Sequence, residues 1–438
     1  MSPTRIAIVG AGPVGLTLAR LIHNKPNIEV VIFESDKSED ARKQGGTLDL
    51  HPGSGLSALE EAGLYDEFLK RARFDGEAVI FTDKNLVKYI EQPRLDEESS
   101  NGRPEIDRYL LREMLLNSVP SEVIRWGCHL RAIDENHNLI FDHGIESGFD
   151  LVVGADGAWS KIRKLVSDEK PHYSGTGGFN FTIPNAEETA PDCYQLTNRG
   201  SLYAYWDGKA IVSQQQGDGS LNVYAFAVRP EDWYNQATFD KNDIQAIRQA
   251  TLEEFSGWDS RLLDFVRHAQ DAVYRSLYML PVGWSWKHRA GMTLIGDAAH
   301  AMTPFAGQGV NLGMEDALKL SQAIIKATNS PESDLTAAIK TFEEDLFVRA
   351  KSTAELTHDM MTWFLFTEGA LRTTIEKVVI RMVSSDMRPP VSWVTYPLLV
   401  AGTYAYYFFF STVSLSVIVK WCFHVLYTSV PYRILFHR

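Results

Sequence analysis

The chain has 438 residues, enough for two or three domains of ordinary size, and its 45% hydrophobic and 23% charged residues are typical of a packed globular protein. Lys and Arg total 43 against 56 Asp and Glu, so the net charge is −13; such a surface repels phosphates, and we expect no nucleic-acid partner. Three cysteines without ligand spacing, Cys128, Cys193 and Cys422, argue against a zinc site or a disulfide framework.

A glycine-rich turn follows the first apolar run, Thr4–Val9, which predicts a buried strand. In the pattern Gly10-X-Gly12-X-X-Gly15, the first glycine permits a tight turn and the second lets a pyrophosphate approach the backbone. The third allows the strand and the following helix, expected over Leu16–Leu21, to pack closely. The predicted dinucleotide-binding residues of this turn are Gly10, Gly12, Pro13 and Gly15.

A second predicted strand, Glu29–Glu34, ends in a carboxylate 19 residues after Gly15. A carboxylate in this position can bind the ribose hydroxyls of a dinucleotide, and we expect Glu34 to do so. The alternative is a glycine turn with an unrelated exposed acid, which the strand–turn–helix context disfavours.

Two later runs predict further strands of a parallel or mixed sheet: Leu151–Ala155, which leads into Asp156-Gly157, and Met292–Ile295. An Asp-Gly pair after a strand is by itself usually a turn. Between them lie β-rich segments separated by turn residues, which predict an antiparallel sheet. These segments are Gly178–Ile183, Leu202–Trp206, Ile211–Gln215 and Leu221–Val228. We therefore expect a discontinuous nucleotide-binding domain with a β-rich insertion.

The run Gly296–His300, followed by Pro304–Asn311, is the most informative. Its glycines and helix start would place bare backbone N–H groups beside a planar ligand, and Asp297 could hold a ribityl hydroxyl. His300 is either a general base or a residue that packs or caps the turn. We favour the second role because no partner acid or nucleophile is spaced to it.

Together these motifs resemble the group A flavoprotein monooxygenases, relatives of para-hydroxybenzoate hydroxylase. The resemblance is greatest to the tetracycline-inactivating monooxygenases and extends from about Arg5 to about Phe366. It rests further on the runs Gln44–His51, Pro104–Arg112 and Glu254–Asp259.

The resemblance implies an FAD-dependent monooxygenase that uses NAD(P)H without a separate domain for it and inserts oxygen from O2 through a flavin hydroperoxide. It implies that Glu34 binds the adenosine ribose, Arg112 contacts FAD near the dinucleotide, and Asp297 holds the ribityl or pyrophosphate portion. It assigns to the cofactor site also Asp156, Pro304, Gly307, Gly309 and Val310. We expect no catalytic acid–base residue and no metal.

The expected fold is α/β: a Rossmann-like, three-layer FAD-binding domain with an inserted β-sheet substrate domain, a bridging C-terminal helix and a hydrophobic helical tail. The bridging helix is predicted by apolar residues at helical spacing within Ser333–Phe366. The expected bounds are 1–80, 104–168 and 290–330 for the FAD-binding domain, 81–103 and 169–289 for the substrate domain, 331–390 for the bridging region and 391–438 for the tail.

At three positions where the tetracycline enzymes present Gln, Arg and His to the antibiotic, this chain has Thr182, Ser201 and Asn222. These residues remove a charge and much hydrogen-bonding reach. Aromatic surface is added by Tyr203, Tyr205 and Trp206. We therefore expect an apolar, polycyclic or prenylated substrate that is hydroxylated or epoxidised in secondary metabolism.

The tail contains an uncharged stretch of 22 residues, Leu398–Val419, close to the roughly 20 that span a bilayer, although Tyr, Ser and Thr lower its hydrophobicity. Aromatic residues and Lys420 follow it and resemble an interfacial belt. A single span from a cytosolic domain would place the tail's positive charges on the far side, so an interfacial hairpin is an alternative, and packing against the body is another. We expect membrane association through residues 391–438, with the catalytic domain facing the cytoplasm.

Other functions stay open at this point. A flavoprotein reductase or dehydrogenase without oxygen insertion would have the same fold, as would a non-catalytic flavin-binding membrane protein. Trp284-Ser285-Trp286 prompts a flavin-dependent halogenase, but Lys287-His288 follows where that family has Ile-Pro. Paired tryptophans on a strand are the interpretation we favour.

Overall fold

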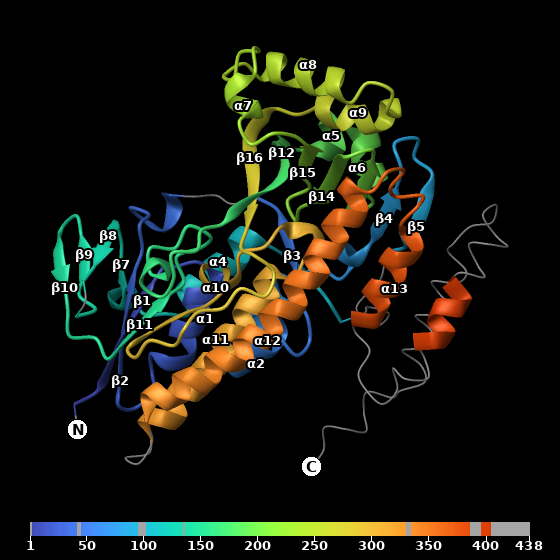
Figure 1. Ribbon diagram of the computed structural model, residues 1–438. Helices are drawn as coiled ribbons and strands as arrows, with labels where there is room; N and C mark the ends of the chain where they lie inside the picture. The colour runs from blue at the N-terminus through green and yellow to red at the C-terminus, as the bar shows by residue number, and fades with distance from the viewer. Residues whose placement is uncertain are drawn as a thin grey trace. The chain divides into compact units, whose positions relative to one another are not determined.

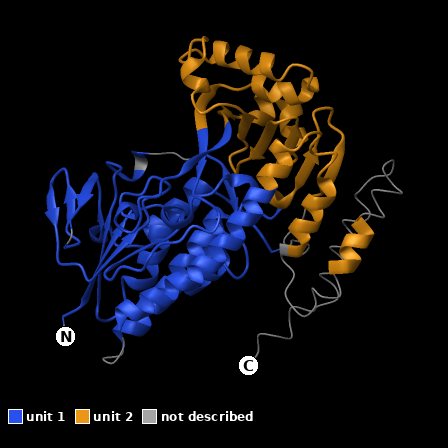
Figure 2. Ribbon diagram, viewed as in Figure 1, with its two compact units in different colours: residues 1–74, 96–176, 276–359 blue, residues 75–95, 177–275, 360–438 orange. Residues whose placement is uncertain are grey.

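The computed structural model describes residues 2–41, 45–94, 102–134, 136–329, 334–385 and 396–403. The chain forms two compact units (Figure 2). The first comprises Met1–Phe74, Asp96–Thr176 and Ser276–Asp359, and the second comprises Asp75–Leu95, Gly177–Arg275 and the residues from Met360 onward.

A five-stranded sheet lies at the centre of the first unit, in the order β17-β11-β1-β2-β7 and with parallel pairing throughout. Its strands are β1 (Thr4–Val9), β2 (Ile28–Phe33), β7 (Ile124–Arg125), β11 (Leu151–Gly154) and β17 (Met292–Leu294). Parallel strands are usually buried on both faces, which explains why their sequences are short, continuous apolar runs. Ile6, Ile8 and Val152 have no exposed surface.

Helices and two small sheets complete the first unit. The N-terminal helix α1 (Pro13–Ile22) packs against α11 (Gly309–Thr328) (Figure 1). Further α-helices in the described part of this unit are α2 (Gly55–Glu61), α3 (Tyr65–Leu69), α4 (Arg108–Asn117), α10 (Asp297–His300) and α12 (Leu335–Met361). One small sheet pairs β3 (Thr47–Asp49) with β6 (Glu105–Asp107), and the other contains β8 (Leu130–Ile133), β9 (Leu139–Phe141) and β10 (Gly144–Glu146).

The second unit is built on a seven-stranded sheet in the order β16-β12-β15-β14-β13-β4-β5. Its strands are β4 (Val79–Thr82), β5 (Lys88–Gln92), β12 (His172–Ile183), β13 (Ser201–Trp206), β14 (Lys209–Gln215), β15 (Leu221–Val228) and β16 (Asp271–Met279). The expected antiparallel pairing holds for β13, β14 and β15, but β13 pairs with β4 in parallel. The difference arises because β4 ends at Thr82 and β13 begins at Ser201, so the two strands are far apart in the chain and no hairpin joins them.

The two faces of this sheet differ, as side-chain alternation along a strand requires. One face packs on helices, among them α6 (Pro191–Thr197) and α9 (Ser260–Arg267), and contributes Phe181, Leu202 and Val223 to a buried core. Further helices described in this unit are α5 (Ala186–Thr189), α7 (Trp233–Gln236), α8 (Ile244–Glu254), the π-helical turn η6 (Thr362–Phe366) and α13 (Ile375–Ser385).

The opposite face carries stacked rings. Phe81 stacks on Tyr203 with centroids 4.8 Å apart, and Tyr205 stacks on Phe364 of η6 at 4.4 Å and an interplanar angle of 4°. We call Phe81, Tyr203, Tyr205 and Phe364 the aromatic face. The expected contribution of Trp206 to this surface is wrong, because Trp206 follows Tyr205 directly and therefore packs against the helix-covered core.

We expected the paired tryptophans Trp284 and Trp286 to lie on a strand, and this is wrong: they lie in the segment that follows β16. Their ring centroids are 5.3 Å apart. The Trp286 indole N–H donates to Glu343 at 3.2 Å, and its ring meets Phe347 edge-on, so side chains of α12 hold this segment in place of a neighbouring strand.

The hydrophobic tail lies outside the described residues except for 396–403, which are helical. Among the helices that the structure describes, none combines the length and the apolar character that a membrane crossing requires.

Candidate active site

Three chain segments meet at one edge of the parallel sheet. β1, β11 and β17 run side by side with Val9 opposite Gly154 and Gly154 opposite Leu294. Because parallel strands end at the same edge, the turns that follow them lie together. The predicted site residues Gly10, Asp156 and Asp297 are therefore neighbours in space although they are far apart in the sequence.

The glycines of the first turn have two different surroundings. A Cβ added at Gly10, where φ is +111°, would lie 2.3 Å from the Ala155 carbonyl oxygen. A Cβ at Gly15 would lie 2.1 Å from the Gly10 carbonyl oxygen. A Cβ at Gly12 would meet no atom within 4 Å. Gly10 and Gly15 are thus required by protein packing, whereas Gly12, which precedes Pro13 at the start of α1, borders open space.

Glu34 is tied into this turn by hydrogen bonds. Its carboxylate accepts from the Ala11 N–H at 2.6 Å, from the Asp36 N–H at 2.9 Å and from the Ser35 hydroxyl at 2.9 Å. Burial would raise the pKa of Glu34, but these bonds and the charge of Arg112 hold it below its usual value. Arg112 itself donates to the Ala11 carbonyl at 3.3 Å and to the Glu39 carbonyl at 2.9 Å. An anionic carboxylate and a guanidinium thus flank the turn.

Asp156 has one satisfied and one unsatisfied oxygen. Oδ2 accepts from the Lys161 N–H at 2.7 Å, while Oδ1 is buried and has no hydrogen-bond partner among the described residues. Burial raises the pKa of Asp156. A buried acceptor without a partner is costly, so this oxygen marks a place where a ligand or water can supply a donor.

Asp297 begins α10, directly after Gly296. Its side chain is exposed, and no described residue donates a hydrogen bond to it. The carboxylate is thus available at the edge where the three strands end.

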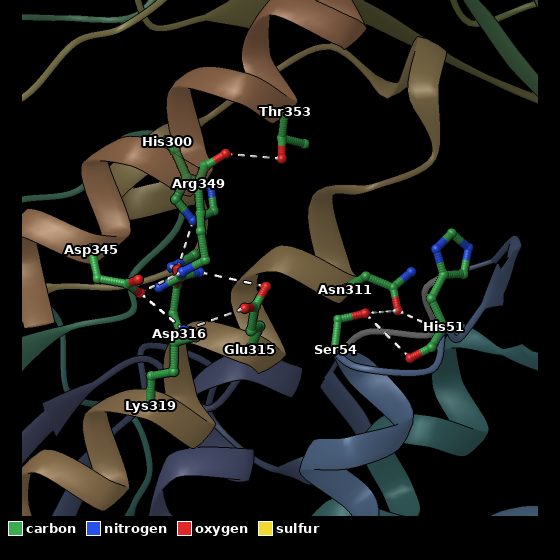
Figure 3. A network of polar contacts seen from close by, with 11 residues as sticks. His51, Ser54, His300, Asn311, Glu315, Asp316, Lys319, Asp345, Arg349 and Thr353 are labelled. Atoms are coloured by element: carbon green, nitrogen blue, oxygen red, sulfur yellow. Dashed lines mark hydrogen bonds and ion pairs between the residues drawn. The ribbon is translucent and has the colours of Figure 1, made fainter. Parts of the chain in front are cut away.

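The run from Pro304 to Val310 forms an open surface. Pro304 and Gly307 are exposed and Val310 is half-buried, and a Cβ added at Gly309 would meet nothing within 4 Å. Asn311, only 1% exposed, anchors this run: its side chain accepts from the His51 N–H at 2.8 Å (Figure 3). It also donates to the Asp49 carbonyl at 2.8 Å.

This arrangement has features that a dinucleotide would complete. Open backbone at Gly12 and Gly309, a carboxylate oxygen of Asp156 without a hydrogen-bond partner among the described residues, and the exposed carboxylate of Asp297 belong to one unit. The FAD binding domain family matches residues 3–345. The chain belongs to that family.

Related proteins extend the assignment. The chain is 31% identical to monooxygenase asqM of Emericella nidulans, covering 81% of this chain and 94% of that protein. It is equally identical to monooxygenase penA of Penicillium thymicola, covering 82% and 95%. This protein is an FAD-dependent monooxygenase with FAD and NAD(P)H as cofactors, as the sequence predicted.

Solved structures share the fold. A salicylate hydroxylase in a substrate complex superimposes with a TM-score of 0.69 over 88% of this chain and 95% of that chain, at 17% identity. The tetracycline destructase Tet(51) gives 0.63 over 88% and 96%, at 20% identity. The α/β monooxygenase fold that we expected is confirmed for the body of the chain.

Sequence reasoning missed the side chains that support the site from behind. The expectation that His300 has no partner acid is wrong: its Nε2 lies 2.6 Å from Oδ2 of Asp316, which has no exposed surface. Asn311 was noted only as the end of the run Pro304–Asn311. A signal was available, because Asp316 is a charged residue among the buried apolar positions of α11, and a buried charge needs partners.

Proposed function

We propose that this monooxygenase hydroxylates or epoxidises an apolar, polycyclic or prenylated small molecule in secondary metabolism. The aromatic face carries the proposal. Tyr203 is only half-buried on top of Phe81, so a ring remains accessible beside the buried Tyr205 and Phe364. Planar apolar groups bind well to such surfaces because offset stacking adds to the area that is buried.

The polar residues on the same side of the sheet support this class of substrate. Ser201 lies opposite Gln214, which lies opposite Asn222, so all three share the side of Tyr203. Ser201 is 4% exposed and its hydroxyl has no partner among the described residues, and the Asn222 amide donates to the Tyr224 hydroxyl at 2.6 Å. Few neutral hydrogen-bonding groups suit a substrate with one or two polar atoms.

One group of curated relatives supports this class by its printed name. Besides the two fungal monooxygenases, the chain is 27% identical to a chloroplastic zeaxanthin epoxidase of Oryza sativa, matching 53% of that protein. It is 25% identical to the FAD-dependent monooxygenase pigN of Monascus ruber. A carotenoid epoxidase among the relatives favours an apolar substrate for this chain too.

We propose that the cofactor is held by Glu34 at the adenosine ribose and by Arg112 nearby. Asp297 would hold the ribityl or pyrophosphate portion, with Asp156 contributing to the same site. The turn residues that would follow the two ends of the cofactor are Gly10, Gly12, Pro13 and Gly15, and Pro304, Gly307, Gly309 and Val310. When bound, FAD accepts hydride from NAD(P)H and activates O2; the protein's part is to position the substrate and exclude water.

The test uses the full-length protein, purified with FAD and solubilised in detergent. NADPH consumption is measured with planar aromatic and terpenoid compounds and with tetracycline, and products are examined for oxygen from labelled O2. We expect stimulation and label incorporation with apolar compounds. Efficient turnover of tetracycline would refute the substrate class, and NADPH oxidation that yields products without the label would indicate a reductase.

A matched pair of variants on one strand tests the aromatic face. Tyr203→Leu should raise the KM for an accepted apolar substrate because it removes the accessible ring. Trp206→Leu, on the opposite side of β13, should leave that KM unchanged. Equal effects of both variants would show that the aromatic face does not bind substrate.

We also propose that residues 391–438 attach the protein to a membrane, with the catalytic domain on the cytoplasmic side. Support comes from the uncharged stretch Leu398–Val419 and from an apolar substrate that would partition into lipid. Fractionation of the full chain and of a chain ending at Pro390 tests this: only the full chain should sediment with membranes. Equal partitioning would refute the proposal.

A further inference from the structure

A buried carboxylate lies directly behind the turn that carries Asp297. Asp316, on α11, has no exposed surface, and its Oδ2 atom meets two groups of the turn. One is the Gly296 N–H at 3.1 Å and the other is Nε2 of His300 at 2.6 Å. These are the residue before α10 and the last residue of α10, so one oxygen atom holds both ends of the turn. Figure 3 shows the contact between His300 and Asp316.

A second contact explains how the charge is kept in a buried position. The other oxygen of Asp316, Oδ1, accepts from Nη1 of Arg349 on α12 at 2.8 Å. Arg349 also donates to Asp345 at 2.7 Å and lies 3.6 Å from Glu315. Burial would lower the pKa of Arg349, but these carboxylates raise it above its usual value. A buried carboxylate is tolerated only when an opposite charge and hydrogen bonds compensate it. Arg349 supplies that charge at Oδ1 of Asp316, and Oδ2 bonds to the turn.

From this geometry we infer that Asp316 is a positioning residue for FAD. It acts through Gly296 and His300, whose places fix where the Asp297 carboxylate points. Gly296 has φ of +60° and ψ of −145°, a conformation that glycine adopts without steric cost but among many others, and the bond from its N–H to Asp316 favours this one. The inference rests on FAD binding alone and is independent of the substrate.

His300 extends the same device. It is 6% exposed, and its Nδ1 has no partner among the described residues, while Nε2 is directed at Asp316. A ring held at only one nitrogen is oriented by that bond. The role of His300 is therefore to transmit the position of Asp316 to the end of α10, which accords with the packing role expected from the sequence.

The chain offers a matched control for Asp316. Glu343 on α12 is also a buried carboxylate, 1% exposed, and it also pairs with a histidine, at 2.7 Å from Nδ1 of His288. It accepts further bonds from Trp286 and from the Thr293 hydroxyl, but none from the residues of the Gly296–His300 turn. Replacing either acid by its amide removes a buried charge, and only one of the two acts on the turn.

The experiment compares Asp316→Asn with Glu343→Gln in the full-length protein. The FAD dissociation constant is obtained from the fluorescence of released flavin, and the thermal unfolding midpoint is measured without added FAD. We expect Asp316→Asn to weaken FAD binding by roughly 10- to 100-fold, since bonds to a buried charged group are lost. Both variants should lower the unfolding midpoint by similar amounts, because each loses hydrogen bonds to a buried carboxylate. Glu343→Gln should leave FAD affinity within about twofold, because the bonds it loses lie away from the turn.

A second pair of variants covers the case in which Asp316→Asn does not fold. His300→Gln keeps an N–H donor toward Asp316 and should retain FAD affinity, whereas His300→Leu removes the donor and should weaken FAD binding. The inference is overturned if Asp316→Asn or His300→Leu binds FAD as the wild type does, or if Glu343→Gln loses FAD as strongly as Asp316→Asn. It is also overturned if His300→Gln and His300→Leu lose FAD equally.

Discussion

Gly15 and Gly12 of the first turn lack a side chain for different reasons: Gly15 because protein atoms leave no room, and Gly12 because a ligand would occupy the space beside it. Gly15→Ala would place a methyl group 2.1 Å from the Gly10 carbonyl oxygen, a backbone atom that cannot rotate away. Gly12→Ala would place one where no protein atom lies within 4 Å, at φ −77° and ψ 174°, which alanine adopts without strain. The same substitution should therefore act on folding at one position and on the cofactor at the other.

The magnitudes follow from these surroundings. Gly15→Ala should lower the free energy of unfolding by about 1–3 kcal/mol or more, the usual cost of overpacking. Gly12→Ala should leave it unchanged or raise it by about 0.4–1 kcal/mol, because alanine restricts the unfolded chain. If a pyrophosphate occupies the space at Gly12, the added methyl should weaken FAD binding by at least about tenfold, or 1.4 kcal/mol.

Urea unfolding without FAD and fluorescence titration with FAD provide the two measurements. Both variants are prepared as the full chain, so each serves as the control of the other. Wild-type FAD affinity in Gly12→Ala would mean that the cofactor does not approach this part of the backbone. Wild-type stability in Gly15→Ala would mean that strand and helix are not in close contact at this turn.

Three further substitutions have defined outcomes. The folded-state pKa of Glu34 is below its ordinary value of 4.5, so its charge stabilises the fold above pH 4.5, and this stabilisation is lost as the pH falls below that value. In urea unfolding, Glu34→Gln should therefore reduce the free energy of unfolding by about 1–3 kcal/mol at pH 7 and by less at pH 4. The pKa of Glu105 is raised from 4.5 to about 8 by burial, so wild-type stability should decline as the pH rises from 4.5 through 8. The thermal unfolding midpoint of Glu105→Gln should equal that of the wild type at pH 4 and exceed it at pH 9. A lower midpoint than that of the wild type at pH 9 would contradict the burial argument. Phe364 is 2% exposed, and Phe364→Ala should lower the urea midpoint by an amount equivalent to about 3–5 kcal/mol, whereas an unchanged midpoint would show that its stack on Tyr205 contributes nothing.

The parts of the site that the sequence predicted are those that depend on local chain geometry. Gly10–Gly15 and Gly296–Asp297 follow short apolar runs, and both lie at the ends of parallel strands. A tight turn between a strand and a helix requires glycine whatever the rest of the fold, so it can be recognised from a few adjacent residues.

The parts that could not be predicted depend on contacts across the chain. The Asn311 side chain accepts a hydrogen bond from the His51 N–H, 260 residues away in the sequence. Asp316 accepts one from the N–H of Gly296, 20 residues earlier. Spacing alone does not specify either pair. Trp206 is a different case, because side-chain alternation already separates it from Tyr203 and Tyr205.

The strand β17 reaches the parallel sheet of the first unit after a long excursion of the chain through the second unit. Among the described strands, β17 pairs with β11 alone; it has three residues, and residues of the second unit intervene between the two in sequence. Closing so long a connection costs little more than closing a shorter one, since the entropy grows only logarithmically with length, but a short edge strand gains few backbone bonds. Two buried carboxylates supply what is missing: Glu343 accepts from the Thr293 hydroxyl within the strand at 2.9 Å, and Asp316 accepts from the Gly296 N–H just after it. Glu343 of α12 thus anchors the strand itself, whereas Asp316 of α11 acts on the turn after the strand, where Asp297 lies beside the turns of β1 and β11.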